Sequence, residues 1–167
     1  MSSTALAFLI LCLSPALGVL VPQHYCDNHF RYARDYDGSP FIGIFTAPKT
    51  KSASLNLMYN WQATFEIQGI HKLFVSPLVT YPSKEEAAAN IMNGEPAQVW
   101  VRFINVTTEL PKLTSLILNG VQLCHSAPYG LPKTRATVKH HMFIAQKQRG
   151  IVPTTEGSPP FYGERTK

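Results

Sequence analysis

The eight residues Leu55-Asn56-Leu57-Met58-Tyr59-Asn60-Trp61-Gln62 form the clearest alternating pattern in the chain. The odd-numbered residues are all apolar or aromatic, and the even-numbered ones are polar except for Met58. Successive side chains of a β-strand point to opposite faces, so a period of two over eight residues predicts a strand with one buried face.

Similar runs lie on both sides of this strand. We predict further strands at residues 30–34, 41–46, 65–67, 70–80 and 98–104, because turn-forming segments separate them. Residues 114–124 add a hairpin, since Asn119-Gly120 suits a two-residue turn in which both positions need positive φ. Ser83 and Glu86 form a capping box that begins a short helix. The predicted fold class is therefore all-β, an antiparallel β-sandwich of about 7-8 short strands with one short α-helix.

Composition is consistent with one folded domain. The chain has 167 residues, 45% of them hydrophobic and only 15% charged, which excludes a disordered protein and provides enough apolar side chain for a core. The net charge of +5 comes from the C-terminal part, where seven basic residues outnumber two acidic ones from His125 onward. We therefore predict that residues 131–167 form a basic flexible tail. Its candidate polyanion contacts are Lys133, Arg135, Lys139, Lys147 and Arg149.

The N-terminus has the features of a signal peptide. Residues 5–13 form an apolar run that is long enough for a signal peptide and shorter than the roughly 20 residues needed to cross a bilayer. Ala16 and Gly18 provide the small residues of a cleavage site, so we predict that residues 1–18 are removed between Gly18 and Val19. The mature chain would be secreted to the extracellular space, with no membrane span.

Secretion changes how the three cysteines are interpreted. Cys12 lies in the leader, which leaves Cys26 and Cys124 as an even pair in an oxidising compartment. We predict a disulfide between them; two free thiols are the alternative. Asn105 begins an Asn-Val-Thr sequon and is a predicted site of N-glycosylation.

Taken in order, the landmarks between residues 26 and 129 resemble the N-terminal domain of the gastrulation-defective (gd) family of insect serine proteases. The resemblance is carried by Cys26 with Phe30 and Tyr32, by Gly43-Ile44, by Ile91 with Gly94 and Pro96, by Val101-Arg102-Phe103, and most specifically by residues 110–124. It implies that residues 19–130 form a non-catalytic regulatory β domain. In family members such a domain precedes a trypsin-like protease domain that acts in extracellular cascades.

Catalytic and metal-binding patterns are weak in comparison. A trypsin-like enzyme needs a Ser-His-Asp triad set on two barrels, and neither a Gly-Asp-Ser-Gly-Gly nor an Ala-His-Cys segment occurs in this sequence. Arg149-Gly150-Ile151-Val152 is similar to a zymogen activation site, but Gly150 would place the new terminus one residue too far out. The adjacent histidines 140 and 141 would point to opposite strand faces, away from a common metal ion. We expect no catalytic residues, no metal site and no cofactor.

These observations favour a secreted interaction module that regulates an extracellular proteolytic cascade. Its expected partner is an extracellular protein, such as a serine protease or another cascade component, with sulfated glycans as a second candidate and nucleic acid excluded by the compartment. Two alternatives remain open. The chain is a truncated fragment of a trypsin-like serine protease zymogen, or it is an extracellular glycan-binding protein that shares only the sandwich.

Overall fold

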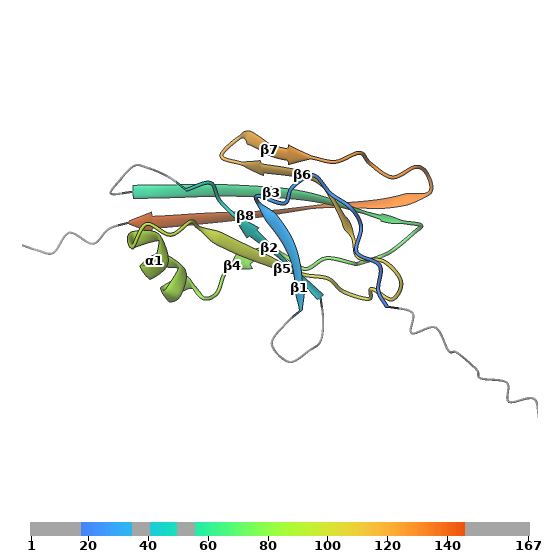
Figure 1. The fold of residues 1–167 in the computed structure, drawn as a ribbon, viewed down its shortest axis with the longest axis horizontal. Coiled ribbons are helices and arrows are strands. Elements are labelled where there is room, and N and C mark those ends of the chain that lie inside the picture. Colours follow the sequence, from blue (N-terminus) through green and yellow to red (C-terminus); the bar gives the residue numbers. More distant parts are fainter. Residues whose placement is uncertain (1–17, 35–40, 50–55, 146–167) are drawn as a thin grey trace, which may run out of the picture.

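The computed structural model describes residues 18–34, 41–49 and 56–145, which form two antiparallel four-stranded sheets packed face to face (Figure 1). One sheet has the order β1-β2-β5-β4, with β1 at Phe30–Arg34, β2 at Phe41–Thr46, β5 at Gln98–Arg102 and β4 at Val79–Thr80. The other has the order β7-β6-β3-β8, with β7 at Val121–His125, β6 at Lys112–Leu118, β3 at Asn56–Gln68 and β8 at Lys133–Ala145. With the single helix α1 at Lys84–Met92, this arrangement confirms the predicted fold class.

Aromatic side chains fill the space between the sheets. Phe45 of β2 lies 6.3 Å from Trp61 and 6.1 Å from Phe65, both in β3, measured between ring centroids. Rings at these separations gain edge and tilted contacts in addition to the burial of apolar area. Tyr59 and Trp61 are buried while Met58 and Asn60 are exposed, so the alternation in this stretch predicted the buried face of β3 correctly.

Two strand boundaries differ from the prediction. The strands expected at 55–62 and 65–67 are parts of one 13-residue strand, β3, because residues 63 and 64 continue the alternation and form no turn. The strand expected at 70–80 is reduced to the two residues of β4 and an isolated bridge between Val75 and Phe103. Pro77 has no backbone N–H to contribute to a ladder, so it interrupts pairing inside this segment.

The prediction of a flexible tail from residue 131 is wrong for residues 133–145. Lys133–Ala145 form β8, which pairs with β3 along its whole length and extends the folded unit beyond the predicted boundary at residue 130. Ala136, Val138, Met142 and Ile144 pack against the core, while the exposed residues 137, 139, 141 and 143 face outward. The basic residues of this segment favoured a solvated tail, although its apolar residues alternate with the period of a strand. Residues 146–167 lie outside the described residues, and their tail character stays a prediction.

The hairpin and the helix form as predicted. Asn119 and Gly120 have φ values of 52° and 81°, the left-handed conformation that the turn between β6 and β7 requires. The Ser83 hydroxyl accepts a hydrogen bond from the backbone N–H of Glu86 at 3.1 Å, which caps α1. The Ser83 hydroxyl also donates to the Glu86 carboxylate at 3.0 Å. In a complete capping box the carboxylate would instead accept from the backbone N–H of Ser83. Gly94, with φ of 85°, follows the end of the helix.

Candidate interaction surface

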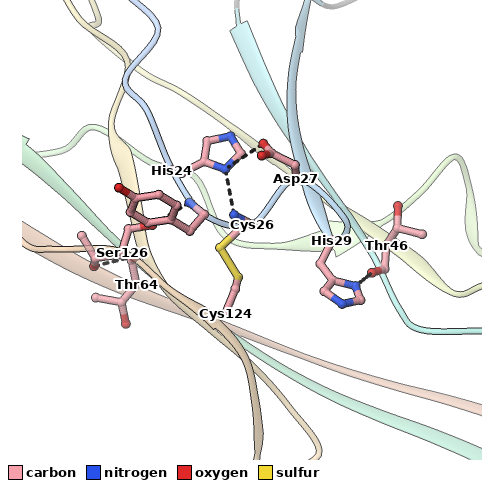
Figure 2. The surroundings of a disulfide bond; sticks show 10 residues. His24, Cys26, Asp27, His29, Thr46, Thr64, Cys124 and Ser126 are labelled. Atoms are coloured by element: carbon pink, nitrogen blue, oxygen red, sulfur yellow. Dashed lines mark hydrogen bonds and ion pairs between the residues drawn. A yellow bond between two sulfur atoms is a disulfide. The ribbon is translucent and has the colours of Figure 1, made fainter.

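A disulfide joins Cys26 to Cys124, as the sequence predicted (Figure 2). Cys26 lies four residues before the start of β1, an edge strand of one sheet, and Cys124 lies in β7, an edge strand of the other. The bond therefore cross-links the two sheets along one side of the sandwich. Cys124 lies in the seventh strand, and β8 follows it in the chain.

The segment before Cys26 is held by several further contacts (Figure 2). Nδ1 of His24 accepts a hydrogen bond from the Cys26 backbone N–H at 3.2 Å and lies 3.5 Å from the Asp27 carboxylate. Burial lowers the pKa of His24, and this effect exceeds the opposing one of Asp27. The backbone N–H of Tyr25 donates to the Ser126 hydroxyl at 3.1 Å. These contacts fix the N-terminal segment against the connection that leaves β7.

A buried carboxylate organises the start of β8. The side chain of Glu66 is fully buried, although it lies on the outer face of β3, and one of its oxygens is 3.0 Å from Nζ of Lys133. Its other oxygen is 2.7 Å from the guanidinium of Arg135, and the backbone N–H of Tyr129 also donates to the carboxylate at 2.8 Å. Burial raises the pKa of Glu66, but the hydrogen bonds from Arg135, Lys133 and Tyr129 outweigh it and hold the pKa below its usual value.

This cluster involves two of the candidate polyanion contacts, whose role stays a prediction. Lys133 and Arg135 both pair with the single negative charge of Glu66, so they support the fold, and a net charge of +1 remains in the cluster. Lys139 is exposed on β8 and keeps its candidate role. Lys147 and Arg149 lie outside the described residues, as does the activation-like sequence that begins at Arg149.

Other predicted sites have simpler outcomes. Asn105 is exposed in the loop between β5 and β6, where its φ is 55°, and glycosylation there stays a prediction. Gly18 and Val19 stand at the start of the described residues, while the rest of the leader lies outside them. His140 and His141 point to different sides of β8, toward Thr80 and Asn60 respectively. Within the described ranges, no three His, Cys, Asp or Glu residues gather as metal ligands, and no helix has the length and hydropathy to span a membrane.

One surface feature was not predicted from the sequence. A groove of about 390 Å³ runs between α1 and β8. Its lining residues come from three elements: Thr80 from β4, Lys84 and Ala88 from α1, and His140, His141, Met142, Phe143 and Ile144 from β8. No local pattern could have indicated the groove, because it depends on which sheet edge lies beside the helix.

The sequence also matches a family model. Residues 24–134 match the model described as the serine protease gd N-terminus, a span of more than half of the chain. The chain belongs to this family. The matched gd region is the N-terminal, non-protease part of such proteins, as the resemblance implied, and the match ends at the second residue of β8. The comparisons with curated proteins and with solved structures gave no match.

Proposed function

We propose that the chain is a secreted, non-catalytic module that binds an extracellular protein of a serine protease cascade and regulates that cascade. The observation that carries this proposal is the match to the gd N-terminal family over residues 24–134. Two independent features agree with an extracellular setting. One is the signal-like leader at residues 1–18, and the other is the Cys26–Cys124 disulfide, a bond that persists in oxidising compartments.

The exposed surface is better suited to protein contact than to a polyanion. Two of the five candidate basic contacts, Lys133 and Arg135, share the negative charge of the buried Glu66. Exposed apolar side chains are present instead, including Ile70 at 89% and Leu131 at 86% relative exposure. The backbone N–H of Gly69, next to Ile70, donates to the carbonyl of Pro132, next to Leu131, so both side chains lie at the same end of the sandwich. Exposed apolar patches commonly mark protein contact surfaces.

The test is a cascade assay. The secreted protein is added to the extracellular fluid of its source organism, and trypsin-like activity is followed with a chromogenic arginine substrate. We expect the folded protein to change the rate at which activity develops, and a Cys26→Ala/Cys124→Ala variant to have a weaker effect. Equal activity with and without the folded protein would contradict the regulatory role.

The non-catalytic part is tested separately. A fluorophosphonate probe is incubated with the purified protein, and labelling is read by mass spectrometry. We expect no labelled serine. Stoichiometric labelling of one serine would show that the protein is an enzyme.

A further inference from the structure

The groove between α1 and β8 lies along a strand edge. Five consecutive residues of β8, from His140 to Ile144, line it. Because successive side chains of a strand point to opposite faces, a hollow on either face would be lined by every second residue. A hollow lined by all five is therefore interpreted as following the backbone of β8. The C-terminal end of this strand lies beside α1 (Figure 1).

The backbone along this edge is available for pairing. β8 is the last strand of its sheet and pairs with β3 on one side only. Among the described residues, none outside β3 makes a backbone–backbone hydrogen bond to residues 140–144. In an antiparallel ladder, alternate residues direct their N–H and C=O groups away from the partner strand. About half of the backbone groups of this segment therefore face the groove.

The neighbouring sheet leaves room for another strand here. Its edge strand on this side, β4, has only two residues, and Thr80 in β4 contacts Nε2 of His140 through its hydroxyl at 3.1 Å. Helix α1 follows β4 and forms the second wall, with Lys84 and Ala88 facing β8. An edge strand beside a helix is an arrangement by which proteins bind an extended peptide as an added strand.

The charge of the groove indicates which kind of peptide segment would bind in it. The lining contains Lys84, His140 and His141 and no acidic residue, with Ala88, Met142, Phe143 and Ile144 as its apolar part. Burial lowers the pKa of His140, and the nearby His141 and Lys84 lower it further, so His140 is neutral at neutral pH and the ammonium of Lys84 supplies the positive charge of the groove. A segment with a carboxylate would complement this charge, and the histidine rings can hydrogen-bond to it.

We infer that the groove binds an extended acidic segment of a partner protein, which adds to the sheet as a strand beside β8. His140 and Met142 are two residues apart and share a face of β8, so on that face the segment would present an acidic side chain near Lys84 and His140 and, two residues away, an apolar one near Ala88 and Met142. The five lining residues of β8 correspond to a recognition sequence of about five residues, at about 3.4 Å per residue. The identity of the partner as a cascade protein rests on the proposed function, whereas binding in the groove does not.

Two other occupants are disfavoured by charge. A second copy of β8 would bring Lys139 and no acidic residue to the same segment beside Lys84, and like charges opposite each other destabilise strand pairs. The chain's own continuation after Ala145 contains two basic residues, Lys147 and Arg149, among its first four. Neither occupant complements the groove as an acidic segment does.

The experiment uses fluorescence anisotropy with the full secreted chain and a labelled heptapeptide in which pairs of glutamates alternate with pairs of valines, so that residues two apart differ in character. Three controls are a peptide with lysine in place of glutamate, a peptide N-methylated at alternate backbone nitrogens, and a second peptide set methylated in the other register. We expect the acidic peptide to bind, the lysine peptide to bind at least about tenfold more weakly, and methylation in one register to abolish binding. Lys84→Glu should weaken binding about tenfold, while Lys72→Glu, the same charge change on an exposed loop residue, should leave it unchanged.

The contradicting results are equally specific. The inference is overturned if the acidic peptide fails to bind at low salt, or if the lysine peptide binds equally well. It is also overturned if neither methylation register matters, because strand addition needs the backbone N–H groups. A concentration-dependent dimer in sedimentation that competes with the peptide would indicate a second copy, and tighter peptide binding after deletion of residues 146–167 would indicate the chain's own segment. Because the assay needs no protease, peptide binding without any cascade effect would contradict the proposed function alone, and the reverse result would contradict this inference alone.

Discussion

The guanidinium of Arg135 in β8 lies 2.7 Å from the carboxylate of Glu66 in β3, whose side chain is completely excluded from solvent. The two residues are directly opposed in the strand register, so the ion pair lies across the longest strand pairing in the fold. It connects β3, the strand that the alternating pattern predicts most clearly, to β8, the strand whose basic residues led to the prediction of a tail.

Replacing Glu66 by glutamine should destabilise the fold. Lys133 is only 17% exposed and would lose its counter-charge, while Arg135 at 59% could turn to solvent. The expected loss lies between that of a surface pair and that of a buried pair, about 1–3 kcal/mol in the free energy of unfolding measured with urea. Glu95→Gln is the matched control, because its ion pair with Lys49 is exposed and should contribute less than about 0.5 kcal/mol. Equal effects of the two variants would show that burial of Glu66 is unimportant.

The same carboxylate should make stability depend on pH. Its pKa is lower in the folded protein than in the unfolded chain, where it is close to the ordinary value of about 4.3. The stabilisation is therefore complete above that value and is lost as the pH falls through the lowered folded-state pKa. Urea midpoints measured from pH 7 to pH 2 should decline on the acid side, and the decline should be shallower in Glu66→Gln. Identical slopes for both proteins would assign the acid sensitivity to other groups.

Removing the disulfide should weaken the whole sandwich, since the bond links edge strands of both sheets across a sequence separation of 98 residues. A Cys26→Ala/Cys124→Ala variant should lose about 2–5 kcal/mol of stability, mostly because its unfolded chain is no longer constrained. Thermal unfolding of the variant and of the wild type, each with and without reductant, measures the effect. Reductant should lower the melting temperature of the wild type only.

Gly43 in β2 has no room for a side chain. A Cβ at this position would stand 2.6 Å from Cε2 of Phe30 and 3.1 Å from Cζ of Phe103. Gly43→Ala should therefore force these rings to move and cost about 1–3 kcal/mol, measured by urea unfolding. Gly130→Ala is the control, because nothing lies within 4 Å of its Cβ position, and it should change stability by less than about 0.5 kcal/mol.

Truncation distinguishes the observed boundary from the one predicted by charge. A chain that ends at residue 145 keeps β8 and should fold with cooperative unfolding. A chain that ends at residue 130 leaves β3 without its 13-residue partner and removes Met142 from the core, so it should be unfolded or aggregated. Circular dichroism and size-exclusion chromatography compare the two. Native-like behaviour of the shorter chain would show that β8 is dispensable.

Local patterns predicted much of the fold. The buried face of β3, the turn at Asn119-Gly120 and the cap at Ser83 each depend on residues a few positions apart, and all three are present in the structure. The disulfide followed from the cysteine count once the leader was set aside. The candidate site is predicted less well, because the charges of Lys133 and Arg135 favour a solvated tail, whereas only the alternation within 133–145 indicates a strand.

By itself, the sequence determined most of the strands, the turn of one hairpin, the start of one helix, and that two cysteines are left to pair, since these properties depend on neighbouring residues or on composition. Only the tertiary structure decided that β8 lies beside β3, that Glu66 is buried although it lies on the outer face of β3, and that a strand edge borders α1. The physical reason is that pairing between distant strands is selected by how the whole core packs, and no run of a few residues specifies its partner.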